Sequence, residues 1–288
     1  MSDIQLLGPN KTNLLAMMKG SDFIIEWVEK LKSEMENVPY RVDDIRKDFY
    51  GLINDIAYCY YRPYLLFEIS ELTNKQKLDF GNLKNNIHVK AIEGLTKNSH
   101  SKKSHFNSLN RNFILDAWST FEICVNTFCE GVFTEPEIDK LLSYKFSDLN
   151  KMLPKGRLTD LELNELKSNL ETKHLTHVPI VRKTDLLFKK VKGYPRNIED
   201  DKKFLSFFGR LRNTMHSNYI HYGNPFEYKF GNAKFIFHNS ELVKWYDPFE
   251  PTPKLYFYLV GNLKDIWRAL IDSIKFDGII YYPNLEQE

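Results

Sequence analysis

The side chains of this sequence that are best suited to chemistry lie between Phe204 and Asn218. A histidine can move a proton near neutral pH, and an arginine can hold phosphate oxygens with its planar fork of N–H donors. Both residue types occur here beside a run of phenylalanines, and a solvated helix face rarely has this composition. The segment therefore suits work on a phosphodiester. The candidate side chains are Arg210, Arg212, Asn213 and His216.

Arg212 and His216 are four residues apart, and residues with this spacing differ by only about 40° around a helix. On a helix they lie on one face, one turn apart, along the edge of an apolar stripe. Arg210 has a different azimuth, so one chain is not expected to use both arginines in the same way. The alternative interpretation is structural: a buried network of ion pairs and hydrogen bonds that joins neighbouring helices.

Helical periodicity dominates the rest of the chain. Pro63 is expected to kink or divide one long helix, and Thr134 with Glu137 predicts a capping box that begins another helix. The polar and basic stretch 97–105 predicts a loop or a junction between subdomains, and the turn residues 222–225 predict the end of the helix that carries His216. Apolar residues that recur every three and four positions predict helices over 21–36, 43–72, 75–95, 113–128, 159–175, 201–221 and 253–276.

Residues 227–237 carry the one convincing β pattern, two short alternating runs on either side of Gly231-Asn232, which predicts a hairpin. The predicted fold class is therefore all-α: a helical bundle with one small β-hairpin inserted after the helix that carries His216. We expect an N-terminal helical extension over 1–100 and a helical domain over 101–288.

The composition limits the kinds of partner. The formal charge of 288 residues is only +2, so any contact with nucleic acid must use local patches. Two basic stretches, 97–111 and 182–196, could form an RNA-contacting rim or could simply be solvated loops. Three cysteines argue against a disulfide framework and fit a reducing compartment. The N-terminus lacks a signal-peptide pattern and no apolar run reaches about 20 residues, so we expect a cytoplasmic protein without a membrane contact.

The spacing of potential ligands gives no support to a metal or a cofactor. Cys124 and Cys129 are five residues apart and do not share a helix face, and His174 and His177 have no evident carboxylate or cysteine partner nearby. The sequence contains no phosphate-binding glycine loop, dinucleotide fingerprint, zinc-protease His-Glu pattern or serine nucleophile elbow. We therefore expect neither a metal nor a cofactor.

Three features together resemble a HEPN domain, the helical "higher eukaryotes and prokaryotes nucleotide-binding" domain. They are Arg-Asn-Thr-Met-His at 212–216, Ala-Trp-Ser-Thr-Phe-Glu at 117–122, and the hairpin after the histidine. The resemblance covers about residues 105–282 and implies a helical bundle of HEPN type. Position by position, the motif histidine is His216 and the polar residue after the arginine is Asn213. Arg210 has the family spacing to the histidine, whereas Arg212 has the Arg-Asn context.

Many HEPN domains are metal-independent ribonucleases of toxin, abortive-infection and CRISPR systems. The resemblance implies that two copies of the chain pair so that both motif helices line one cleft. His216 then acts as general base on a ribose 2′-hydroxyl or polarises it, and Arg212 or Arg210 stabilises charge on the phosphorane oxygens. Glu122 either orients one of these groups or is a structural partner of an arginine. The implied products are a 2′,3′-cyclic phosphate and a 5′-hydroxyl.

The resemblance also implies the partners. RNA would be the substrate, a second copy of the chain would complete the site, and a phage-defence or toxin–antitoxin setting would add a cognate antitoxin or defence partner. One alternative is a non-catalytic HEPN-like scaffold that binds a partner, a nucleotide or RNA through the same cleft. Another is an RNA-binding module that uses the basic stretches without cleavage.

Overall fold

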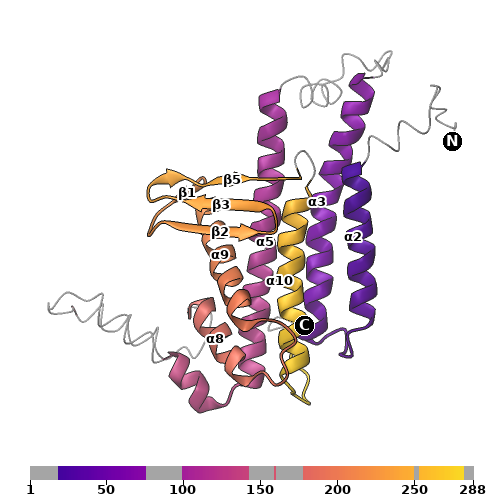
Figure 1. Ribbon diagram of the computed structural model, residues 1–288. Coiled ribbons are helices and arrows are strands. Elements are labelled where there is room, and N and C mark those ends of the chain that lie inside the picture. Colours follow the sequence, from indigo (N-terminus) through magenta and orange to yellow (C-terminus); the bar gives the residue numbers. More distant parts are fainter. Residues whose placement is uncertain (1–18, 76–98, 143–158, 160–177, 250–252, 282–288) are drawn as a thin grey trace. The chain divides into compact units, whose positions relative to one another are not determined.

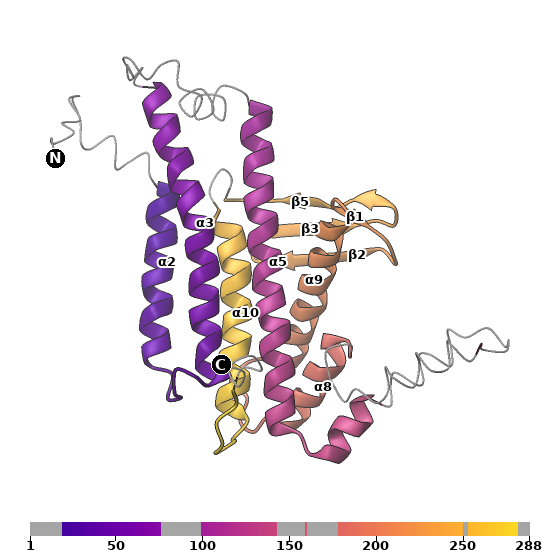
Figure 2. The same cartoon turned by 180° about the vertical axis from the view of Figure 1, so that it is seen from behind.

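The structure is a computed structural model that describes residues 19–75, 99–142, 159, 178–249 and 253–281. Within these ranges the chain is mostly helical with a small antiparallel sheet region, as Figures 1 and 2 show from opposite sides. This confirms the predicted predominance of helix. A further helix covers 135–142. The long helices are α2 (Lys19–Glu36), α3 (Ile45–Lys75), α5 (Ser99–Val132), α8 (Ile180–Lys190), α9 (Ile198–His216) and α10 (Lys254–Ser273).

The chain divides into two compact units, each assembled from three segments. Unit 1 contains the described residues within 1–37, 50–117 and 210–262. Unit 2 contains those within 38–49, 118–209 and 263–288. Both units therefore draw on residues before and after position 100, where the sequence predicts a domain boundary.

Aromatic side chains form the core of unit 1. Phe257 of α10 stacks on Phe113 of α5 with 4.5 Å between ring centroids, and Tyr60 of α3 packs on both rings. Phe23 and Trp27 of α2 add edge contacts to Phe257. Pairs of this kind contribute about 0.5–1.5 kcal/mol each beyond the area that they bury. The first two described helices thus share one core with α5 and α10.

Unit 2 has a second aromatic core around Trp267 of α10. Its ring lies 5.1 Å from Phe49 and 5.6 Å from Phe128, and its indole N–H donates to the carbonyl of Arg46. Trp118 of α5 stacks on Phe208 of α9 at 5.3 Å and 14°. A tryptophan buried with a bonded N–H fixes both the packing and the orientation of its helix. The phenylalanine-rich faces of α5 and α9 predicted from sequence are therefore buried.

The sheet region is larger than the one hairpin that the sequence predicts. Strands β2 (Phe226–Phe230) and β3 (Ala233–Phe237) form the hairpin, with Gly231 in the turn at φ +56°. β3 also pairs with β5 (Lys244–Tyr246), and β1 (Ile220–His221) pairs with β4 (Glu241–Leu242). The additional strands are two or three residues long, so they carry no detectable alternation.

The loop predicted over 97–105 is wrong for its described part, because α5 begins at Ser99. Serine and histidine are mediocre helix formers, but tertiary packing usually decides where a helix begins. Here His105 stacks on Phe67 of α3 at 5.9 Å, and Phe106 lies 4.5 Å from Phe67 and 5.4 Å from Tyr64. These contacts extend the helix through a polar sequence.

The basic stretch 182–196 is also not a solvated loop, because most of it belongs to α8. Lys183 is buried and donates to the side chain of Asn126. Lys190 lies 2.8 Å from Glu137, and Arg196 forms a two-nitrogen contact with Asp201. Three charges of this stretch therefore serve contacts within unit 2, which weakens its interpretation as an RNA-contacting rim.

Other helix ends agree with prediction in part. The helices expected over 21–36, 43–72 and 253–276 correspond to α2, α3 and α10, and α3 continues through Pro63 without division. The predicted capping box is half formed: the backbone N–H of Thr134 donates to Glu137 at 2.9 Å. The helices expected over 75–95 and 159–175 fall almost entirely outside the described residues, as do His174 and His177.

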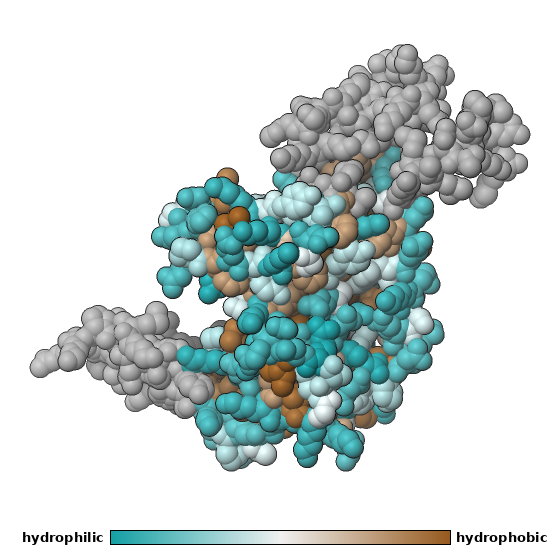
Figure 3. Space-filling view, in the orientation of Figure 1, coloured by the Kyte–Doolittle hydropathy of each residue, from teal (hydrophilic) through white to brown (hydrophobic). Residues whose placement is uncertain are grey.

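Figure 3 shows a largely hydrophilic surface on one face of the molecule, with scattered apolar residues. The exposed apolar side chains include Val42, Leu66 and Leu242, which come from separate parts of the chain. In the described ranges, no helix combines the length and the hydropathy needed to cross a bilayer.

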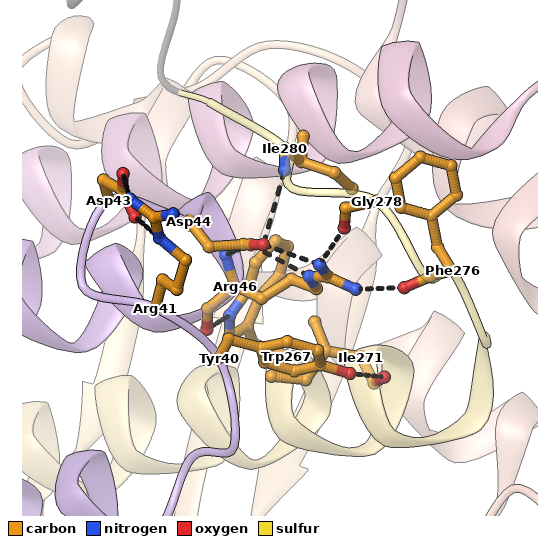
Figure 4. A network of polar contacts seen from close by, with 10 residues as sticks. All are labelled: Tyr40, Arg41, Asp43, Asp44, Arg46, Trp267, Ile271, Phe276, Gly278 and Ile280. Carbon is orange, nitrogen blue, oxygen red and sulfur yellow. Dashed lines mark hydrogen bonds and ion pairs between the residues drawn. The ribbon is translucent and has the colours of Figure 1, made fainter.

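A buried ion pair fastens the segment after α10 to the start of α3 (Figure 4). The guanidinium of Arg46 donates to both carboxylate oxygens of Asp44 at 2.9 and 2.6 Å and to the carbonyl oxygens of Phe276 and Gly278. Asp44 also accepts from the backbone N–H of Ile280 at 3.3 Å. Because the donors and acceptors are matched, the two charges are tolerated in the interior.

We expect Arg46→Ala to lower the free energy of unfolding by about 3–5 kcal/mol, because it leaves the buried Asp44 carboxylate without its counter-charge. Urea denaturation of the full chain measures this. The control is Arg41→Ala, which removes an arginine paired with Asp43 at the surface, also drawn in Figure 4. Its denaturation midpoint should stay close to that of the wild type. Equal shifts for the two variants would contradict the role assigned to Arg46.

Candidate functional site at the end of helix α9

Helix α9 has a well-defined start. The side-chain oxygen of Asn197 accepts from the backbone N–H groups of Glu199 at 2.9 Å and Asp200 at 3.2 Å, which is an N-cap. Asp201 in the first turn is held by Arg196 and by the hydroxyl of Tyr194 at 2.7 Å. These contacts begin the helix at Ile198, three residues earlier than the sequence pattern predicts.

The last two turns of α9 carry four of the five candidate residues. Leu211 and Met215 lie on the buried face of the helix, so residues at other positions around the helix are more exposed. Arg210 and Arg212 are half-buried, whereas Asn213 and His216 are exposed. His216 is the final residue of the helix. The histidine is therefore accessible to a ligand from solvent.

The two arginines have different surroundings. The guanidinium of Arg210 lies over the ring of Phe226 in β2, 4.7 Å from the ring centroid. Arg212 donates from Nη1 to the side-chain oxygen of Asn213 at 3.2 Å. Arg212, Asn213 and His216 thus share the end of the helix, while Arg210 is engaged with the sheet. The structure thus separates the two arginines by their contacts: Arg212 bonds to a neighbour on α9, and Arg210 contacts β2.

Glu122 is half-buried on α5 and belongs to unit 2, whereas the other four candidates belong to unit 1. Its predicted role of orienting the arginine or the histidine stays a prediction.

Helix α9 ends at His216, not at His221 as the sequence predicts. The chain reverses because Asn218 and Tyr219 adopt left-handed backbone conformations, with φ of 51° and 66°. The N–H of Tyr219 donates to the carbonyl of Thr214 at 2.6 Å and closes the helix end. Asparagine tolerates this conformation, but it is uncommon for a bulky aromatic residue and marks a strained position.

Tyr219 is held in this conformation by contacts with two other elements. Its hydroxyl donates to the backbone carbonyl of Asn107 in α5 at 3.2 Å, and its ring lies 5.7 Å from Trp245 in β5. Burial raises the pKa of the Tyr219 phenol, and the positive charge of Arg111 on α5 opposes this increase. The structure therefore brings Arg111 and Tyr219 together at the end of α9.

The sequence pattern does not predict an interaction between Arg111 and Tyr219. Arg111 lies at the end of the basic stretch 97–111, and Tyr219 follows His216 by three positions. No helical or strand spacing connects these two residues in the sequence. The contact depends on the left-handed turn, which the sequence pattern does not predict.

His221 serves the fold. It is buried in β1, its Nε2 lies 3.0 Å from the carbonyl oxygen of Asn224, and its ring packs edge-on against Phe237. Within the part of the chain that the structure describes, no group of three histidine, cysteine, aspartate or glutamate side chains is arranged to hold a metal ion.

Comparisons of the chain with protein families, curated proteins and solved structures give no match. The function of the site is therefore inferred from its own residues and geometry.

We expect Asn218→Val to lower the free energy of unfolding by about 1–2 kcal/mol, because a β-branched residue is strained at this positive φ. The side chain of Asn218 is exposed, so little packing is lost. Asn218→Gly is the matched control. Its free energy of unfolding should stay within a few tenths of a kcal/mol of the wild-type value, since glycine adopts this conformation freely. Urea denaturation compares the three proteins. Equal loss in the valine and glycine variants would show that φ is not the cause.

Proposed function

We propose that the protein is a metal-independent endoribonuclease of HEPN type that acts through an Arg/His cleft between two copies of the chain. The observation that carries this proposal is the arrangement of Arg212, Asn213 and the exposed His216 at the end of α9. An arginine fork and an accessible imidazole within one helical turn are the groups that phosphodiester cleavage needs without a metal.

In the proposed reaction the imidazole of His216 removes the proton from a ribose 2′-hydroxyl, and O2′ attacks the adjacent phosphorus. The bond between phosphorus and O5′ breaks, and the leaving oxygen takes a proton from solvent or from the histidine of the second copy. Arg212 stabilises the negative charge that develops on the non-bridging oxygens. The products are a 2′,3′-cyclic phosphate and a 5′-hydroxyl, and no electrons are gained or lost.

The proposed partners follow from this chemistry. RNA is the substrate because the 2′-hydroxyl is the nucleophile. A homodimer supplies two histidines and two arginines to one cleft, and a phage-defence or toxin–antitoxin role would require a cognate partner that restrains the activity.

A non-catalytic scaffold that binds RNA, a nucleotide or a protein through the same residues is the second candidate. The contact of Arg210 with Phe226 favours it, because this guanidinium already has a neighbour within one copy. The presence or absence of cleavage separates the two candidates.

We expect the purified protein to cleave structured RNA in excess EDTA and His216→Ala to reduce the rate by about 10²–10⁴-fold, because the proton acceptor is lost. His238→Ala is the control, since His238 is also an exposed histidine of unit 1 but lies after β3. It should keep the wild-type rate. Product termini are identified by mass spectrometry. Absence of cleavage under every condition, with a folded wild type, would favour the scaffold.

The two arginine variants test the geometry of the site. Arg212→Ala should lower the cleavage rate by about 10²–10³-fold, as expected for loss of a group that stabilises the transition state. Arg210→Ala removes a contact with Phe226 and should change the rate by less than about tenfold, with a small loss of stability. Single-turnover rates and thermal unfolding of both variants measure this. The reverse order of the two rates would reassign the catalytic arginine to Arg210.

A further inference from the structure

A half-buried arginine on α5 has a polar atom without a partner. The Nε of Arg111 is inaccessible to solvent and has no hydrogen-bond partner among the residues that the structure describes. A buried N–H group without an acceptor costs free energy, and a bound acceptor would remove that cost. An arginine fork suits an oxyanion because it can donate two parallel hydrogen bonds.

The phenol of Tyr219 interacts electrostatically with this guanidinium. The hydroxyl of Tyr219 reaches the carbonyl of Asn107, which is four residues before Arg111 and on the same face of α5. At 3.2 Å this hydrogen bond is longer than the usual O–H···O range, so the hydroxyl can turn to a better acceptor. Burial raises the pKa of the Tyr219 phenol and the positive charge of Arg111 acts to lower it, so the two groups are close enough to interact electrostatically.

The backbone of Tyr219, which positions the phenol, has a strained conformation. Tyr219 has a φ of 66°, and its N–H closes the end of α9 on Thr214. Strained conformations of non-glycine residues persist where the surroundings enforce them, often at ligand sites. His216 is only three residues before Tyr219, so the strained turn connects the histidine to the phenol.

We propose that Arg111 and Tyr219 bind a phosphate group of the RNA strand next to the scissile phosphodiester. The identification of the strand as RNA rests on the proposed function, whereas the binding of phosphate does not. Arg111 acts as the fork that holds two phosphate oxygens, and the Tyr219 hydroxyl leaves Asn107 to donate to one of them. Both are positioning residues, because neither is assigned a contact with the reacting atoms.

The test uses a single-stranded oligonucleotide that is 2′-deoxy throughout, which has the phosphates but lacks the nucleophile for cleavage. The dissociation constant is measured by fluorescence anisotropy at several salt concentrations for the wild type, Arg111→Ala, Arg111→Lys and Tyr219→Phe. The control is Arg62→Ala, which removes an exposed arginine from α3 in the same unit. Competition with inorganic phosphate and with acetate at equal ionic strength separates a phosphate site from a carboxylate site.

We expect Arg111→Ala to weaken binding by about tenfold and to reduce the slope of log affinity against log salt by about 0.7, the value for one phosphate contact on a single strand. Arg111→Lys should keep the slope but bind more weakly, because the charge remains and the fork is lost. Tyr219→Phe should weaken binding by about two- to threefold. Arg62→Ala should match the wild type in both quantities. Inorganic phosphate should compete better than acetate.

An unchanged salt slope in Arg111→Ala overturns the proposal, and better competition by acetate than by phosphate overturns the choice of phosphate. If Arg111→Ala does not fold, as judged by circular dichroism, Arg111→Gln replaces it and the same slope decides. Cleavage of RNA by the wild type with no effect of Arg111 on the slope refutes this site alone. Arg111-dependent binding without any cleavage refutes the proposed function alone.

Discussion

The buried aromatic face of α5 is the constraint on which the cores and the candidate site depend. In unit 1 it packs through Phe113 on α3 and α10, and in unit 2 it packs through Trp118 on α9. Within unit 1, the contacts of Phe113 fix the rotation of that part of α5 about its own axis. The same rotation determines where Asn107 and Arg111 lie, so the direction of the polar side chains follows from the packing of the apolar ones.

The candidate site residues Arg212, Asn213 and His216 lie at the C-terminal end of α9, shortly before strand β1. The last turn of a helix has carbonyl groups without intrahelical partners, and here those of Asn213 and Thr214 accept from the N–H groups of the following turn. The left-handed conformations at Asn218 and Tyr219 are balanced by the contacts of Tyr219 with Asn107 and Trp245. The turn after α9 is therefore strained but fixed by the contacts of Tyr219. His216 is exposed at the surface, and its backbone position is nevertheless well defined.

Local patterns in the sequence predict much of the helical structure and part of the site. The helices α2, α3 and α10 are predictable because the apolar residues that recur at helical spacing in them are also the residues that are buried. The start of α5 was missed because its stability comes from Phe67, which lies 38 positions before His105 in the sequence. Strands β1 and β4 have two residues each and carry no alternation. Arg212, Asn213 and His216 have a local spacing that the sequence shows directly, and their role as a site stays a prediction. The bond between Tyr219 and Asn107 spans 112 positions, so no local pattern in the sequence predicts it.

The network around Arg46 has a consequence for how the protein is made. The carbonyl groups of Phe276 and Gly278 that accept from Arg46 lie 230 and 232 positions after it. At ribosomal rates of 5–20 residues per second, roughly 10–50 s pass between the synthesis of the arginine and the arrival of these acceptors. During that interval the guanidinium and Asp44 must stay hydrated, and the start of α3 cannot take its final buried position. The network around Arg46 therefore cannot be completed before residues 276–278 have been synthesised.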